Sequence, residues 1–200
     1  FHWDHPQALE DLGGFRHPDV SAWCADYTTL LARHFGDRVR HWFTLNEPHA
    51  FIEGGLRHGR HAPALQLPLS QVLLAAHNAL LCHGRAVQAI RAHVKDSFVT
   101  AAPVLIAAAP ATESAEDLEA ARHLTFTTRG TELRDSAFWM DPMYLGHYPE
   151  SALRSFGEAM PRVTDSDMRV IHQPLDAFGC NLYDVVRVRA GSDGRPEVIP

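Results

Sequence analysis

The chain has 200 residues, enough for one domain with a sizeable core. Hydrophobic residues make up 46% and charged residues 21%, and the formal net charge is -6 with scattered Lys and Arg. This balance argues against nucleic acid or an anionic membrane as the main partner, and no apolar run reaches the roughly 18 residues of a membrane span. No feature predicts an oligomeric state.

Cysteine and histidine spacing gives no sign of a disulfide framework or a metal centre. The three cysteines are odd in number and far apart, so we expect buried thiols in a reducing, cytoplasmic compartment. Among 14 histidines only His58/His61 and His2/His5 are closely spaced, and neither pair has the flanking acid of a helical zinc motif. We therefore predict no metal and no other cofactor.

The first half of the chain predicts a helix, a strand and a second helix. Apolar residues recur at helical spacing over about 20–31. Residues 38–46 (RVRHWFTLN) form a short apolar run with aromatics, which is typical of a buried parallel strand. A loop rich in Gly, His and Pro follows over 49–68, and a long helix with one apolar face is predicted for 70–93.

The second half continues the alternation. Its predicted elements are a buried strand at 97–109, an acidic, Ala-rich helix at 114–134, a short helix at 167–173 and a strand at 177–189. Between them, Asp141 before Pro142 is typical of a turn or cap. Trp139 and Tyr148 are predicted to anchor the core or a loop, since aromatics mostly serve burial.

This order predicts an α/β fold in which parallel strands alternate with helices in one domain, 1–200. An open doubly wound sheet would carry a Gly-rich phosphate turn after its first strand, and none is present. A (β/α)8 barrel instead places polar residues at the carboxyl ends of its strands, as Asn46, Glu47, Asn181 and Tyr183 are placed here. A full barrel takes about 250 residues, so the prediction is a partial, incomplete TIM barrel.

The run TLNEP places a carboxyl where a core strand stops. A carboxyl partly withdrawn from water can keep its proton near neutral pH and protonate a poor leaving group such as a sugar oxygen. Asn46 is positioned to bind a substrate hydroxyl, and Pro48 has no N–H to continue the ladder. By spacing alone, Glu47 is equally compatible with a loop residue that caps a backbone amide.

Five segments in order resemble glycoside hydrolase family 1, the β-glucosidase family. They are FHWDHPQAL with LGG, WFTLNEP, AAHNALLCHGRAV, FWMDPMYLGHYPE and FGCNLYDVV. The resemblance covers nearly the whole chain and implies an internal part of the barrel, from about strand three to strand six. It implies a retaining β-glycosidase whose partner is a small-molecule β-glycoside or oligosaccharide.

The resemblance also implies a role for individual residues. Glu47 matches the general acid/base, and Asn46 matches the amide that binds the sugar 2-hydroxyl. His2 matches the histidine of the first sugar subsite, with Trp3 supporting the pocket. Two further matches complete the set: Asn181, which lines that subsite, and Tyr183, which matches the tyrosine that hydrogen-bonds the nucleophile.

The family's nucleophile motif, Ile/Val-Thr-Glu-Asn-Gly, is absent, and the nearest string, Ala111-Thr112-Glu113-Ser114, follows a different strand. Because a retaining enzyme needs a second carboxyl, these residues alone are predicted to be inactive. Leu182 replaces a family tyrosine, and HAPAL replaces the commoner His-Ala-Pro-Gly. Two alternatives stay open: a 6-phospho-β-glycosidase and a non-catalytic sugar-binding remnant.

Overall fold

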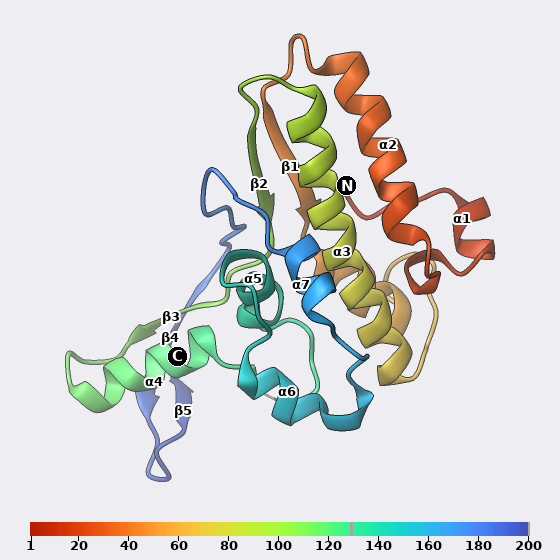
Figure 1. The fold of residues 1–200 in the computed structure, drawn as a ribbon. Helices are drawn as coiled ribbons and strands as arrows, with labels where there is room; N and C mark the ends of the chain where they lie inside the picture. The colour runs from red at the N-terminus through yellow and green to blue at the C-terminus, as the bar shows by residue number, and fades with distance from the viewer. Residues whose placement is uncertain (129, 200) are drawn as a thin grey trace.

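Helices alternate with short strands along the whole computed structural model, which describes residues 1–128 and 130–199. Figure 1 shows the course of the chain. The helices are α1 (Gln7–Asp11), α2 (Val20–Phe35), α3 (Leu69–His93), α4 (Ala115–Phe126), α5 (Ser136–Tyr144), α6 (Glu150–Phe156) and α7 (Asp165–Ile171), with a π-helix at Ala50–Arg57 and 3-10 turns at Gly14–Arg16 and Gly157–Ala159. The strands are β1 (His41–Asn46), β2 (Phe98–Ala102), β3 (Ala107–Pro110), β4 (Val185–Ala190) and β5 (Pro196–Ile199).

The sheet is largely parallel, as the sequence predicts. β1 pairs with β2 in parallel, starting with His41 opposite Phe98. An isolated parallel bridge joins Val104 to Asn181, and β3 then pairs in parallel with β4. Among the strands of the described residues, only β5 runs antiparallel, as the partner of β4. The described residues thus form two short sheets, of two and three strands, which do not close into a barrel.

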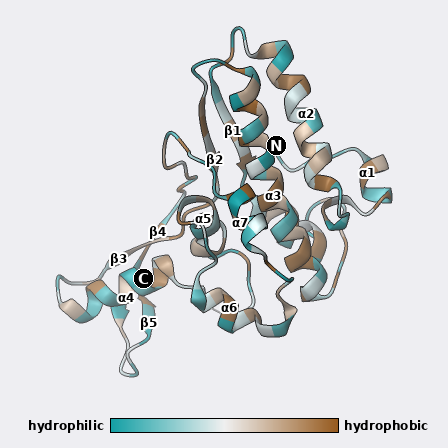
Figure 2. Ribbon diagram, in the orientation of Figure 1, coloured by the Kyte–Doolittle hydropathy of each residue, from teal (hydrophilic) through white to brown (hydrophobic). Residues whose placement is uncertain are grey.

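The long helix α3 organises the main body, by which we mean residues 1–105 and 130–176. Its buried face packs against α2, α7 and the two strands β1 and β2 (Figure 1). Apolar and polar residues alternate along α2 and α3, as is typical of amphipathic helices (Figure 2). Gly84 lets α3 pack closely against α7, because a Cβ at this position would lie 1.8 Å from the Val170 carbonyl oxygen. Large residues fill the centre: Trp139, Phe138, Ile52, Leu73, Leu80 and Leu133 are fully buried.

A second, smaller unit projects from the main body at the lower left of Figure 1. This outlying unit comprises residues 106–126 and 185–199, which include β3, α4, β4 and β5. Its separate core contains four buried residues: Ala120, Ala121, Leu124 and Val188. The Asp117 side chain joins helix to sheet, since its carboxylate accepts hydrogen bonds from the backbone N–H groups of Thr112 and Ala190.

Several predicted boundaries are confirmed and others are wrong. The helices at 20–31 and 70–93 and the strand at 38–46 correspond to α2, α3 and β1. The predicted strand 97–109 is two strands, because the proline at 103 interrupts the run. The predicted helix 114–134 ends at Phe126, and its residue 129 lies outside the described part. In the predicted strand 177–189, regular pairing begins only at Val185.

The segment between α4 and α7 is more helical than predicted. Asp141 and Pro142 lie inside α5 and do not form a turn, and α6 has no counterpart among the predicted elements. Trp139 and Tyr148 are buried, which confirms them as anchors. The Trp139 indole N–H donates to the Leu133 carbonyl at 2.7 Å, so its polar atom is satisfied inside the core. No described helix combines the length and apolarity that crossing a bilayer requires.

Candidate active site

Glu47 lies at the carboxyl edge of the β1–β2 pair. Its backbone N–H donates to the Ala102 carbonyl at 2.9 Å, so the residue is still anchored to the end of β2. Its φ is 44°, in the left-handed region, and its carbonyl accepts a hydrogen bond from the Ala50 N–H. Pro48 follows at once, and the chain enters the π-helix. The strand therefore stops abruptly and leaves a carboxyl at the rim that is only 7% exposed.

Two side chains from a distant segment hydrogen-bond to this carboxylate. The Tyr183 hydroxyl donates to Glu47 Oε1 at 2.5 Å, and Asn181 Nδ2 donates to the same oxygen at 2.9 Å. Asn181 Nδ2 also lies 3.0 Å from Asn46 Oδ1. The Asn181 backbone is fixed by its parallel bridge to Val104. Parallel pairing thus carries residues more than a hundred positions apart to one edge of the sheet.

The beginning of the chain reaches the same edge. The Phe1 carbonyl accepts a hydrogen bond from the Asn46 N–H at 3.0 Å. The Trp3 indole N–H donates to the Asn46 carbonyl at 3.2 Å. The His2 ring stacks on the Trp3 ring with centroids 5.0 Å apart. All six residues predicted for the site, His2, Trp3, Asn46, Glu47, Asn181 and Tyr183, therefore belong to one connected cluster.

Tyr183 has a partner that the resemblance does not imply. Family likeness predicts a hydrogen bond to the nucleophile, whereas in this structure the hydroxyl contacts the predicted acid/base. The hydrogen bond to the Glu47 carboxylate raises the pKa of Tyr183, because it favours the protonated phenol. The side chain is 72% exposed. The contact with a nucleophile stays a prediction.

Sequence reasoning missed His49, a basic residue close to Glu47 that also lies near Arg134 and His61. Burial lowers the pKa of His49, the Glu47 carboxylate acts in the opposite direction, and the nearby Arg134 and His61 lower it further. The His61 ring also lies 5.2 Å from the Trp3 ring. The available signal was position, since His49 is the second residue after Glu47 in a loop rich in histidine.

One cluster in the described residues has metal-ligand geometry. Ligand atoms of Glu53, His58 and Glu132 all lie within 4.8 Å of one another. Arg57 occupies the same cluster, with Nη1 3.3 Å from Glu53 Oε1, and so supplies positive charge that a cation would otherwise provide. The Leu133 N–H also donates to Glu53 Oε1 at 2.8 Å. These contacts make the cluster an ion-pair network that holds the loop after β1.

The family model of glycosyl hydrolase family 1 matches residues 1–197. A 1,4-beta-D-glucan glucohydrolase from Thermotoga neapolitana is 34% identical over 183 residues, which is 92% of this chain and 41% of the relative. Beta-glucosidase A from Thermotoga maritima is 33% identical over 198 residues, which is 99% of this chain and 43% of that relative.

Solved structures agree with these relatives. A beta-glucosidase from Thermotoga maritima in complex with deoxynojirimycin superposes with a TM-score of 0.80 at 32% identity, over 100% of this chain and 44% of that chain. The same protein in complex with glucoimidazole also gives 0.80. The chain thus spans less than half the length of the relatives it matches. By sequence and by fold alike, these 200 residues belong to glycosyl hydrolase family 1.

Proposed function

We propose that this chain forms the acid/base side of a retaining β-glycosidase that removes terminal β-D-glucosyl or related residues. The observation that carries the proposal is the placement of Glu47, a nearly buried carboxyl at the end of a parallel strand. Two neutral groups donate hydrogen bonds to it, the Tyr183 hydroxyl and the Asn181 amide. A carboxyl held in this way is suited to deliver a proton to a glycosidic oxygen and to recover it from water.

The neighbouring residues are suited to hold a sugar against that carboxyl. The Asn46 amide is proposed to bind the 2-hydroxyl, a contact that tightens as the sugar ring becomes oxocarbenium-like. His2 and Trp3 are proposed to bind the sugar in the first subsite, and Asn181 to line it. The solved relatives in complex with deoxynojirimycin and glucoimidazole support a small sugar-like ligand as partner.

The attacking carboxylate is proposed to come from outside these residues. A retaining mechanism places its two carboxyls about 5–5.5 Å apart. Glu113, in the nearest match to the nucleophile motif, lies in the bend before α4 of the outlying unit and is exposed. We therefore propose that the nucleophile joins Glu47 only when the rest of the barrel is present, and that the 200 residues alone are inactive.

The test is Glu47→Gln in a protein that carries this chain together with the flanking barrel strands. We expect kcat/KM to fall about 10²–10⁴-fold for an alkyl β-glucoside, whose leaving group needs protonation. For a dinitrophenyl β-glucoside the loss in glycosylation is expected to be far smaller, because that leaving group departs without a proton.

Glu53→Gln is the matched control, since Glu53 is an equally buried carboxyl after the same strand but belongs to the ion-pair network. It is expected to leave the ratio between the two substrates unchanged. Equal losses on both substrates in Glu47→Gln would contradict the acid role. Binding of glucoimidazole without turnover in the unaltered protein would favour a sugar-binding remnant.

A further inference from the structure

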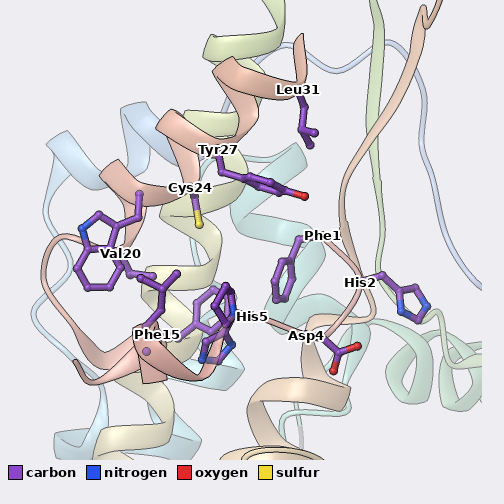
Figure 3. Close-up of a pocket in the computed structure, with 13 residues that line it drawn as sticks. Phe1, His2, Asp4, His5, Phe15, Val20, Cys24, Tyr27 and Leu31 are labelled. Atoms are coloured by element: carbon purple, nitrogen blue, oxygen red, sulfur yellow. The ribbon is translucent and has the colours of Figure 1, made fainter. Parts of the chain in front are cut away.

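The two walls of the candidate active site are held in different ways. His2 follows Phe1, whose ring packs edge to face on the rings of Phe15 and Phe51, at centroid distances of 5.5 and 5.1 Å. Figure 3 shows the Phe1 ring on the side of α2 and the His2 ring on the opposite side of the chain. Aromatic packing thus holds the first wall. The wall that carries Asn181 is held by hydrogen bonds.

This second wall is the site segment, by which we mean residues 176–183, and it runs beside the end of β2. The Asp176 N–H donates to the Val99 carbonyl at 3.0 Å, and the Asn181 N–H donates to the Pro103 carbonyl at 2.9 Å. Five residue steps of the site segment therefore lie opposite four steps of its neighbour. One extra residue in a ladder is a β-bulge, which leaves a backbone group unpaired and turns the side chains that follow it.

The Tyr144 hydroxyl binds the bulge from the side of α5. The Gly179 N–H donates to Tyr144 Oη at 3.0 Å. The same hydroxyl lies 3.5 Å from the Ala177 carbonyl oxygen and 3.4 Å from Thr100 Oγ1, which itself donates to that carbonyl at 2.8 Å. The Tyr144 ring also contacts the Phe178 ring, with centroids 5.1 Å apart. One phenol thus contacts three consecutive residues of the bulge.

Both partners in this contact are fixed by their surroundings. Gly179 allows the site segment to lie against β2, because a Cβ there would lie 2.1 Å from the Ala101 carbonyl oxygen. Tyr144 is the last residue of α5, whose Phe138 and Trp139 are fully buried. A side chain on a helix that is packed into the core is held more precisely than one on a loop.

We propose that Tyr144 is a positioning residue for the candidate active site. Asn181 follows the bulge, and its Nδ2 donates to Asn46 Oδ1 at 3.0 Å and to Glu47 Oε1 at 2.9 Å. By binding the Gly179 N–H, the Tyr144 hydroxyl fixes the shape of the bulge and hence the direction of the Asn181 amide. Tyr144 acts through this amide and does not itself touch Glu47. The role rests on the proposed function, in which Glu47 is the proton donor.

The experiment compares Tyr144→Phe with the unaltered protein that carries this chain and the flanking barrel strands. The variant keeps the ring against Phe178 and removes only the hydroxyl. We expect kcat/KM to fall about tenfold for an alkyl β-glucoside, since a misplacement of about 1 Å can cost about 100-fold. The fall should be clearly smaller for a dinitrophenyl β-glucoside, which needs no proton. Amide hydrogen exchange at Gly179, followed by NMR, should speed up because its N–H loses its acceptor.

Tyr148→Phe is the matched control, since it removes the same atom from another buried hydrogen bond. The Tyr148 hydroxyl lies 3.0 Å from His77 Nδ1, on α3, so its partner is not the site segment. We expect this variant to lower the midpoint of thermal unfolding. It should leave unchanged the ratio of kcat/KM between the two glucosides and the exchange rate at Gly179.

The outcomes separate the positioning role from the proposed function. If Glu47→Gln changes the substrate ratio and Tyr144→Phe does not, the positioning role is overturned and the proposed function stands. The same change of ratio in Tyr148→Phe would also overturn the role, because any core defect would then produce it. So would an unchanged exchange rate at Gly179 in Tyr144→Phe. Equal losses on both substrates in Glu47→Gln would contradict the proposed function itself, and the catalytic consequence assigned to Tyr144 with it.

Discussion

The main body and the outlying unit are stabilised by cores of different composition. The body buries large side chains such as Phe138 and Trp139, and aromatic residues of this size remove 150–250 Å² each from water. The four buried hydrophobic residues of the outlying unit's core include two alanines. We therefore expect the body to set the free energy of global unfolding and the unit to open at lower cost.

The largest effect is expected from Gly84→Val in the body. A Cβ at this position would lie 1.8 Å from the Val170 carbonyl oxygen, which is backbone and cannot move without displacing α7. We expect the free energy of unfolding to fall by about 3 kcal/mol or more, as measured by urea denaturation. Arg85→Ala, at the exposed neighbouring position, should change it by less than about 0.5 kcal/mol. Similar values for both variants would mean that α3 and α7 do not pack as described.

A pH effect of nearly that size is expected from His83, also in the body. His83 is fully buried, shares a hydrogen bond of 2.6 Å with Thr44 Oγ1, and burial lowers its pKa to about 4. The unfolded state, with a pKa near 6.5, binds the proton more readily, so stability is lost as the pH falls from about 6.5 to 4. The total loss of stability is roughly 3 kcal/mol, because each unit of pKa difference between the folded and unfolded states corresponds to about 1.36 kcal/mol.

Urea titrations at several pH values measure this dependence. His83→Gln should flatten the profile over that range, although it lowers stability at neutral pH. His93→Gln is the control, because His93 is exposed at the end of the same helix. Since burial also lowers the pKa of His49 and His77, part of the slope should remain in His83→Gln. An unchanged slope in that variant would contradict the role assigned to His83.

A smaller and local effect is expected from Leu124→Ala in the outlying unit. Leu124 is 4% exposed and is the largest of the buried residues in that core. We expect about 2 kcal/mol of local destabilisation, at the low end for such truncations because the cluster is small. Amide hydrogen exchange should speed up in α4 and β4 while α3 stays protected. Equal acceleration in α3 would show that unit and body unfold together, which would remove the contrast between them.

The smallest effect is expected from Arg189→Ala in the β4–β5 hairpin. The guanidinium makes two hydrogen bonds of 2.9 Å to Glu197, but both side chains are about half exposed. Exposed ion pairs contribute little because water and salt screen them. The midpoint of thermal unfolding should therefore stay within experimental error. A clear drop would indicate that this pair supports the hairpin more strongly than its exposure suggests.

The parts of the fold that follow from local pattern were predictable, and the parts set by tertiary contact were not. The helical spacing of apolar residues predicts α2 and α3. α3 buries much of its surface, whereas only Val20 and Ala32 of α2 are buried and its apolar Tyr27 and Leu30 are exposed. Asp141-Pro142 resembles a turn in isolation, but packing of the surrounding aromatics keeps it within α5. Asn46 and Glu47 stand out because polar residues occur where an apolar strand ends. The bond from Tyr183 to Glu47 joins segments that only the folded sheet brings together, so no local pattern contains it.

The left-handed backbone at Glu47 has a consequence for how this position tolerates change. A side chain with a Cβ is strained at a φ of 44°, whereas glycine adopts that conformation freely. Glycine would relax the main chain and remove the proposed proton donor in the same step. Selection for turnover and selection for easy folding therefore favour different residues here, and a library screened only for expression should drift away from glutamate. Screening for sugar release should hold it fixed.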